Sequence, residues 1–162
     1  MYKQYLKIKP TNTGKGVFAG IDIPAQSPII EVTGDIHTQQ TMPNPQNSAW
    51  IQVTNKYFIG PSGSFDDQIR HSCDPNSYLQ VVGSRAILYS LYLIKADNEI
   101  TFDYSTTSTD TLDTWKLNCK CLSFKCRKVI SGIQYLSEEL KEEYKKKGML
   151  PLFLTDKRFK EF

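Results

Sequence analysis

The sequence predicts a mostly β protein made of several small sheets, with one helix close to the C-terminus. Two observations lead to this prediction. Most of the chain consists of short runs rich in β-branched and aromatic residues, separated by glycine, proline and asparagine, which is typical of short strands joined by turns. A helical spacing of apolar residues appears only from residue 136 onward.

Seven short runs have the composition of strands, and they are residues 16–19, 29–32, 50–53, 57–59, 78–82, 85–91 and 99–102. Turn residues at 24–28 separate the first two runs, and a tight polar turn at 54–56 separates the next two. Gly83-Ser84 predicts a two-residue hairpin, because glycine adopts a positive φ at little cost. Residues 37–47, rich in Gln, Pro and Asn, are predicted as a loop or an irregular insert.

The helix has both a start signal and a stop signal. Ser137 can cap its N-terminus, Glu138 and Glu139 fall in the first turn, Lys145–Lys147 fall in the last turn, and Gly148 ends it. This arrangement of charges also complements the helix dipole. One face is expected to dock on the body of the protein, because apolar residues recur every four positions at Leu136, Leu140 and Tyr144.

The length and composition fit one soluble globular domain. The 162 residues are 40% hydrophobic and 23% charged, which allows a core of ordinary size. The net charge of +3 is too small and too dispersed to indicate a nucleic-acid surface, so no direct nucleic-acid partner is expected. The N-terminal residues include several lysines and no long apolar stretch, so we expect no secretory signal, no membrane segment and an intracellular, reducing location.

Three of the four cysteines lie close together, at Cys119, Cys121 and Cys126. In a reducing compartment such residues are thiols or metal ligands rather than disulfide partners. Zinc favours four ligands in a tetrahedron, and the remaining cysteine, Cys73, supplies the fourth. A closed site of this kind is structural, because no position remains for a catalytic water. The alternative is a set of buried free thiols, which the basic residues around the cluster disfavour.

Four motifs follow one another along the chain. They are GKGVFA at 14–19, RHSCDPN at 70–76, EITFDY at 99–104 and Cys-x-Cys-x4-Cys at 119–126. In this order they resemble the SET-domain protein lysine methyltransferases, over roughly residues 5–130. Each motif is weak alone, but the ordered set is specific. A cysteine cluster ahead of the SET domain is missing, so the chain looks like a minimal SET protein.

The resemblance implies the SET fold, a β-clip-like arrangement of several small antiparallel sheets with a zinc-binding loop behind it. It implies a SET domain at 1–116, a post-SET zinc segment at 117–130 and a helical extension at 131–162. The implied activity is transfer of methyl groups from S-adenosylmethionine (SAM) to the ε-amine of a lysine. The implied substrate is a histone or another chromatin or cellular protein, and one structural zinc is expected.

The resemblance also implies the site residues. Cofactor binding is expected from Gly14, Lys15, Gly16, Tyr57, Arg70, His71, Tyr104 and Lys120, and zinc binding from Cys73, Cys119, Cys121 and Cys126. Tyr104 is expected as the central catalytic residue, with Phe102 and Tyr57 beside it. Tyr57 fits a core position equally well, and Phe102 has a plain alternative as a strand aromatic. Because Phe102 lacks a hydroxyl, the expected products include di- and trimethyl-lysine.

Three positions depart from the family pattern. Arg70 stands where the family usually has Asn, while Leu122 and Lys128 stand where it often has Gly. The first departure keeps open a rival interpretation, a SET-like protein-interaction module with weak or lost catalysis. The other two predict a differently shaped zinc loop. A third interpretation is a zinc-stabilised β-rich binding protein of unrelated fold, which would bind metal without SAM.

Overall fold

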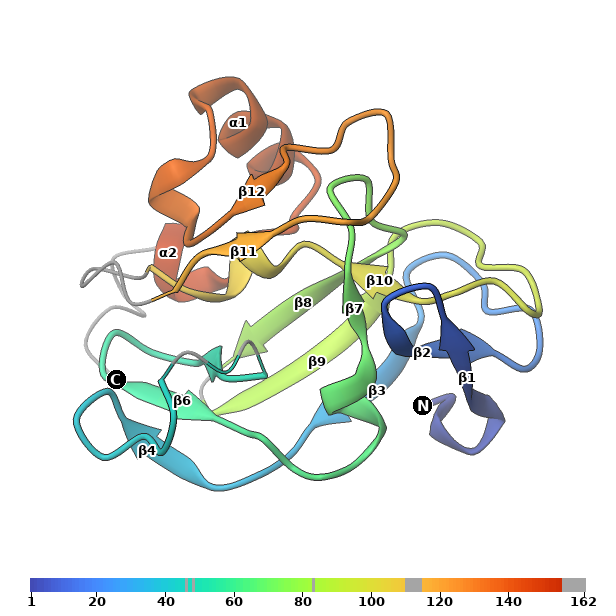
Figure 1. Cartoon of the computed structure of the whole chain (residues 1–162), viewed down its shortest axis with the longest axis horizontal. Coiled ribbons are helices and arrows are strands. Elements are labelled where there is room, and N and C mark those ends of the chain that lie inside the picture. Colours follow the sequence, from blue (N-terminus) through green and yellow to red (C-terminus); the bar gives the residue numbers. More distant parts are fainter. Residues whose placement is uncertain (46, 48, 83, 110–114, 156–162) are drawn as a thin grey trace.

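The computed structural model describes residues 1–45, 47, 49–82, 84–109 and 115–155 (Figure 1). The strands are β1 (Leu6–Thr11), β2 (Gly14–Ala19), β3 (Pro28–Val32), β4 (Ile36–Thr38), β5 (Ile51–Gln52), β6 (Tyr57–Ile59), β7 (Arg70–His71), β8 (Ser77–Val82), β9 (Arg85–Ser90), β10 (Thr101–Phe102), β11 (Leu117–Asn118) and β12 (Val129–Ile130). The α-helices are α1 (Glu138–Lys146) and α2 (Leu152–Thr155), and single 3-10 turns occur at Lys3–Tyr5, Phe65–Gln68, Tyr104–Thr107 and Ile133–Tyr135. No helix among these residues has the length and apolar character needed to cross a bilayer.

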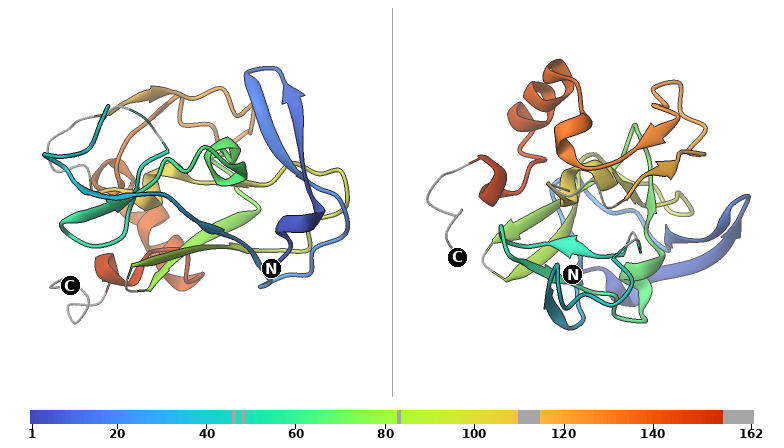
Figure 2. Two further views of the ribbon diagram at one scale, coloured as in Figure 1. Left: turned by 90° about the horizontal axis from the view of Figure 1, so that it is seen from below. Right: turned by 60° about the vertical axis from the view of Figure 1, so that its left-hand side comes forward.

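The described strands form five small sheets, which confirms the mostly β prediction. The central sheet has the order β3-β9-β8 and a second sheet has the order β4-β6-β5. Strands β1 and β2 form one antiparallel hairpin, and β11 pairs with β12 in the same way. The hairpin β1–β2 and the β4-β6-β5 sheet lie on opposite sides of the central sheet, and α1 lies beside β12 (Figures 1 and 2).

One pair departs from the antiparallel prediction. Strands β7 and β10 are parallel, with Arg70 beside Thr101 and His71 beside Phe102. Each strand has two residues, so neither carries a side-chain alternation that a sequence can reveal. This pair brings the segment 70–76 against the segment 99–104.

The main core lies against the central sheet. Strand β9 alternates between buried and less buried positions, which turns Ala86, Leu88 and Ser90 inward. Val17 of β2 and Ile100 join them with no exposed surface. The predicted hairpin around residue 83 therefore has both of its strands in place, although Gly83 itself lies outside the described residues.

Other strand predictions also need correction, and β11 and β12 fall outside all of the predicted runs. Strand β1 was missed because only Leu6 of its residues is buried, and it is held by its pairing with β2 instead. Strand β4 extends into the stretch predicted as loop, where it pairs with β6. The strand predicted at 99–102 is reduced to β10, because Glu99 makes only an isolated bridge, to Phe18.

Helix α1 confirms the predicted C-terminal helix. The side chain of Ser137 accepts a hydrogen bond from the backbone N–H of Leu140, and Gly148 follows the helix with a φ of 67°. Leu136 and Tyr144 are buried in a second apolar cluster. Helix α2 was not predicted, and residues 156–162 of the expected extension lie outside the described residues.

Candidate active site and metal centre

Tyr104 follows β10 as the first residue of a 3-10 turn. Its hydroxyl donates a hydrogen bond of 2.7 Å to the carbonyl oxygen of Ile69. Its ring packs against those of Phe102 and His71, with centroids 4.9 Å and 5.5 Å away. Burial raises the pKa of Tyr104 well above its usual range, so the phenol stays neutral at ordinary pH.

Tyr104 lines two cavities, and it is the one described residue that the two have in common. The first, here called the Arg70 cavity, has a volume of about 400 Å³. Five of the predicted cofactor-binding residues line it, and they are Lys15, Arg70, His71, Tyr104 and Lys120. The β7–β10 pairing explains why segments so distant in the sequence share one cavity.

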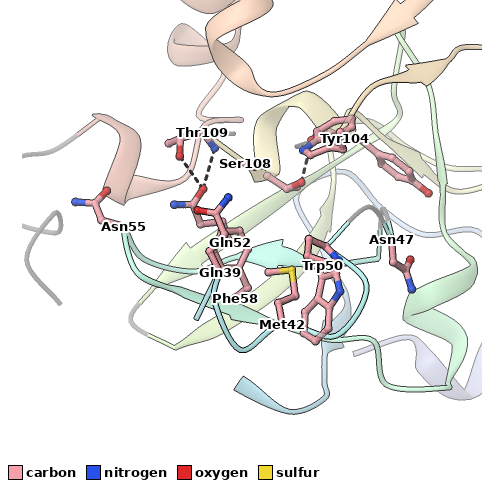
Figure 3. Close-up of a pocket in the computed structure, with 13 residues that line it drawn as sticks. Gln39, Met42, Asn47, Trp50, Gln52, Asn55, Phe58, Tyr104, Ser108 and Thr109 are labelled. Carbon is pink, nitrogen blue, oxygen red and sulfur yellow. Dashed lines mark hydrogen bonds between the residues drawn. The ribbon is translucent and has the colours of Figure 1, made fainter. Parts of the chain in front are cut away.

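The second, here called the Trp50 cavity, has a volume of about 220 Å³ (Figure 3). Aromatic rings of Trp50, Phe58, Tyr104 and Trp115 contribute to its wall. Among the described residues that line it, none carries an Asp, Glu, Lys or Arg side chain. On the polar side, Gln52 accepts hydrogen bonds from the backbone N–H and the hydroxyl of Thr109, at 2.8 and 3.1 Å. The cavity is therefore mostly aromatic and uncharged.

Tyr57 lines neither of these cavities, contrary to its predicted role. Successive residues of a strand point to opposite faces, so it is Phe58 that faces the Trp50 cavity. Tyr57 is 36% exposed, and the ammonium of Lys56 lies over its ring, 5.3 Å from the centroid.

Gly14 and Gly16 of the first motif do not line the Arg70 cavity. Their contribution is a backbone conformation at Gly14 and the absence of a side chain at Gly16. Gly14 has a φ of 128°, which favours glycine at the turn between β1 and β2. A Cβ added at Gly16 would lie 2.3 Å from Oε1 of Glu99. Gly16 therefore leaves room for a carboxylate that sequence reasoning did not assign to the site.

The carboxylate of Glu99 forms an ion pair with Arg70. Nε of Arg70 donates to Oε1 of Glu99 at 2.5 Å, and Nη2 donates to Oε2 at 2.8 Å. Nη1 of Arg70 also donates to the hydroxyl of Thr13. Arg70 thus lines the cavity as half of a fixed ion pair, not as an unpaired cation.

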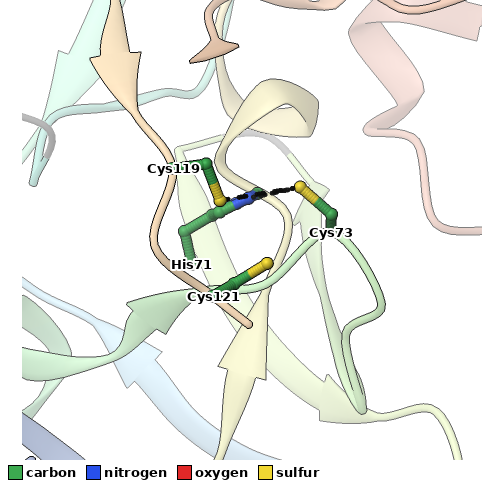
Figure 4. A group of neighbouring side chains, drawn as sticks. All are labelled: His71, Cys73, Cys119 and Cys121. Atoms are coloured by element: carbon green, nitrogen blue, oxygen red, sulfur yellow. Dashed lines mark hydrogen bonds between the residues drawn. The ribbon is translucent and has the colours of Figure 1, made fainter. Parts of the chain in front are cut away.

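Three of the four predicted metal ligands, Cys73, Cys119 and Cys121, converge in space together with His71 (Figure 4). Ligand atoms of Cys73, Cys119, Cys121 and His71 all lie within 4.8 Å of one another. The Sγ atoms of Cys73 and Cys119 are 3.7 Å apart, close to the roughly 3.8 Å that separates two sulfurs on a tetrahedral zinc with bonds of about 2.3 Å. Burial raises the pKa of the Cys73 and Cys119 thiols, whereas backbone N–H groups and the neighbouring thiols outweigh burial at Cys121 and lower its pKa to about 7. The cluster has the geometry and chemistry of a thiolate metal site.

His71 belongs to this cluster, which the sequence did not predict. The backbone N–H of Tyr104 donates to Nδ1 of His71 at 3.2 Å, and Oδ1 of the Asp103 carboxylate lies 3.4 Å from the same nitrogen. Nε2 lies 3.1 Å from Sγ of Cys73, within hydrogen-bonding distance. Burial lowers the pKa of His71 to about 4, which keeps the ring neutral. His71 therefore contacts a predicted metal ligand while it also holds the backbone of Tyr104.

Cys126 lies at the edge of the cluster. Its Sγ is 3.8 Å from the carbonyl oxygen of Cys119, and it is close enough to Cys119 and Cys121 to influence the pKa values of their thiols. Leu122 and Lys128, which occupy expected glycine positions, have φ of 60° and 68°. The loop thus has the left-handed backbone that glycine favours at both positions, so the expected change of loop shape is not apparent there.

The fold and site together define a small β protein with a thiol cluster beside two cavities that share a tyrosine. The SET domain family model matches residues 14–105, over half of the chain, and the chain belongs to this family. It is 25% identical over 146 residues to the histone-lysine N-methyltransferase trithorax of Drosophila virilis, and 28% identical over 133 residues to ash1 of Drosophila melanogaster. These matches cover 80% and 74% of this chain but only 4% and 6% of the relatives.

Among solved structures, the chain is similar to KRYPTONITE in complex with mCHH DNA, H3(1-15) peptide and SAH. The TM-score is 0.62 with 25% sequence identity, over 78% of this chain and 29% of that one. This similarity agrees with a SET fold for the described part of the chain.

Proposed function

We propose that the chain transfers methyl groups from SAM to the ε-amine of a lysine in a protein substrate. The observation that carries the proposal is that Tyr104 is the described residue common to the Arg70 and Trp50 cavities. A group transfer requires donor and acceptor to be held in line at one point. The Arg70 cavity is the donor side in this proposal, and the Trp50 cavity is the acceptor side.

The Arg70 cavity fits the chemistry of the donor. Lys15 and Lys120 offer cationic groups for a carboxylate, in a space of about 400 Å³. The KRYPTONITE structure contains SAH, the molecule that remains when SAM has lost its methyl group. When bound, SAM supplies the methyl group as an electrophilic carbon on a sulfonium sulfur.

The Trp50 cavity suits a lysine that must react as a neutral amine. An unperturbed lysine has a pKa of about 10.4. Entry into an aromatic, uncharged cavity disfavours the ammonium by desolvation and lowers that value. A strong base in the protein is therefore unnecessary.

Tyr104 orients the reacting groups rather than removing a proton. Its own proton is directed to the carbonyl of Ile69, which leaves oxygen lone pairs to accept contacts from the amine or from the polarised methyl carbon. A phenol that remains neutral through the physiological range suits this role.

The substrate class we propose is a histone or another chromatin or cellular protein inside the cell. Trithorax and ash1 are histone-lysine N-methyltransferases, and the KRYPTONITE complex contains an H3 peptide. Within this proposal residues 1–116 form the SET domain, 117–130 the metal-binding segment and 131–162 a helical extension.

We also propose one structural zinc at the thiol cluster. Cys73, Cys119 and Cys121 would bind it, with Cys126 as the fourth ligand that the SET resemblance implies, although His71 is the residue whose ligand atom lies within the cluster. The ion would hold the segment 117–121 against the Arg70 cavity, since Cys119, Lys120 and Cys121 line it. Zinc would thereby support donor binding without joining the reaction.

The test is transfer of isotopically labelled methyl groups from SAM to core histones and to a whole-cell protein extract. Labelled lysines, mapped by mass spectrometry, are the expected result. Tyr104→Phe keeps the ring and removes the hydroxyl, so it should lower kcat far more than SAM affinity. Wild-type protein that labels no lysine in either mixture would contradict the proposal.

The rival function, a protein-interaction module, is favoured by one observation: Arg70 is already paired with Glu99. Calorimetric titration with SAM, run beside the transfer assay, separates the two. SAM binding with transfer supports the enzyme, whereas SAM binding without transfer to any protein supports the module. Metal binding without SAM binding would favour an unrelated zinc-stabilised binding protein.

A further inference from the structure

The residue before Tyr104 is a buried acid with several partners. The side chain of Asp103 has no exposed surface. Nη1 and Nη2 of Arg127 donate to its two oxygens at 2.6 and 2.7 Å, and the hydroxyl of Tyr144 donates to Oδ2 at 2.8 Å. Such donors are required here, because an ionised carboxylate without them is too costly to bury.

Both partners come from outside the stretch that matches the SET domain family. Arg127 follows the last cysteine of the metal-binding segment, and Tyr144 lies on α1. Tyr144 is 3% exposed and belongs to the apolar cluster that docks α1. Burial and the charge of Asp103 raise the pKa of Tyr144, so its hydroxyl remains a hydrogen-bond donor.

Asp103 in turn shapes the turn that begins with Tyr104. Its Oδ1 accepts the backbone N–H of Ser105 at 3.0 Å, which caps this 3-10 turn. Its backbone carbonyl accepts the N–H of Thr106 at 3.0 Å. The position of the Asp103 carboxylate is thus coupled to the backbone that carries the Tyr104 ring.

We propose that Tyr144 and Arg127 are positioning residues for Tyr104, which act through Asp103. Helix α1 then helps to fix the position of Tyr104 through the Tyr144 hydroxyl, in addition to packing against the apolar core. The kinetic consequence rests on the proposed methyl-transfer function, but the structural coupling does not.

The first measurement is hydrogen exchange, which needs no substrate. Tyr144→Phe removes one hydroxyl and keeps the buried ring. The amides of Ser105 and Thr106 should exchange at least several-fold faster in this variant, since the cap that protects them is loosened. Tyr92→Phe is the matched control, because it removes a hydroxyl whose partner is Lys147 and not Asp103, and it should leave these amides unchanged.

The second measurement is the split between kcat and SAM affinity. Tyr144→Phe should lower kcat by about tenfold, the rate equivalent of one hydrogen bond to a charged group, with SAM affinity and zinc content unchanged. Arg127→Lys keeps the positive charge but loses the two-pronged contact, and should act in the same direction. It provides a second test if Tyr144→Phe folds poorly.

Unchanged exchange at Ser105 and Thr106 in both variants would overturn the inference. Faster exchange with wild-type kcat would equally overturn it, because the network would then be structural only. A wild-type protein without transfer activity would overturn the proposed function instead, and the exchange result would still decide the coupling.

Discussion

Arg70 and Glu99 form a two-pronged ion pair in which the Arg70 side chain is 25% exposed and the Glu99 side chain 21%. The hydrogen bonds to Glu99 raise the pKa of Arg70 above its usual range despite partial burial. Arg70 occupies a position where the family usually has Asn, so this chain supplies a counter-ion for the added charge. The pair is possible because Gly16 leaves space for the Glu99 carboxylate.

The first prediction concerns SAM affinity. Arg70→Ala leaves the Glu99 carboxylate unpaired next to a cavity that has to accept the carboxylate of SAM. We expect the dissociation constant of SAM to rise by about tenfold, equivalent to about 1.4 kcal/mol. Arg70→Ala combined with Glu99→Gln should recover part of this loss, because the repulsion is removed.

Calorimetric titration of the single and double variants measures this effect. Lys95→Ala is a matched control, since it breaks an exposed ion pair, with Asp22, outside the cavity. Equal SAM affinity in all four proteins would mean that Arg70 does not serve the cofactor.

The second prediction distinguishes the fourth metal ligand. Purified protein is expected to hold close to one equivalent of zinc. If the four cysteines hold the ion, Cys126→Ser should lose most of this zinc and bind SAM more weakly, whereas His71→Asn should retain the zinc. Elemental analysis after dialysis decides between them, and loss of zinc from His71→Asn alone would make the histidine the ligand.

The third prediction concerns strain in the metal loop. Leu122 is 80% exposed and has a φ of 60°, a conformation that is costly for a residue with a Cβ. Leu122→Gly should raise the free energy of unfolding by roughly 1 kcal/mol, with little packing lost. Thermal unfolding of the zinc-loaded protein tests this, and Leu122→Ala should show no comparable gain.

The fourth prediction concerns pH. Since burial raises the pKa of Tyr104, the phenol stays protonated while the substrate amine loses its proton. The transfer rate should therefore rise between about pH 7 and pH 10 as neutral lysine accumulates. Tyr104→Phe should lower the rate by a similar factor across this range. Loss of an ionisation from the pH–rate profile of this variant would identify Tyr104 as a base.

Local features of the fold were predictable from the sequence. The β8–β9 hairpin and α1 are formed by residues that are close together in the sequence, so local patterns predict them. Ser137 caps α1, as its residue type predicts. The parallel β7–β10 pair was not predictable, because its strands have two residues each and lie far apart in the sequence.

The same division applies to the site. Ordered motifs indicated Tyr104, Arg70 and the cysteines, but not the contacts that connect them. The bond from Tyr144 to Asp103 joins residues 41 positions apart, and no local pattern reports it. Glu99 lay within a recognised motif, yet its role depends on space beside Gly16 that only the fold reveals.

The last prediction concerns how many methyl groups are added, and it rests on Phe102. This side chain is 5% exposed and lines neither the Arg70 nor the Trp50 cavity, but its ring centroid lies 4.9 Å from that of Tyr104, and the SET resemblance places it beside the reacting amine. A tyrosine hydroxyl at this position would hold a water beside the reacting amine and leave less room for an amine that already carries methyl groups. Phenylalanine offers no such hydrogen bond, so di- and trimethyl-lysine are expected among the products.

Phe102→Tyr should shift the products toward monomethyl-lysine at matched turnover, as measured by mass spectrometry of the methylated peptide. If Phe102 is only a core aromatic, the added hydroxyl would instead cost about 1–3 kcal/mol of stability and leave the product ratio unchanged. Phe153→Tyr is the matched control for that cost, because Phe153 is 2% exposed in the main core. A shift in products from Phe102→Tyr but not from Phe153→Tyr would place position 102 at the reacting amine, while identical product ratios in the two variants would remove it from the active site.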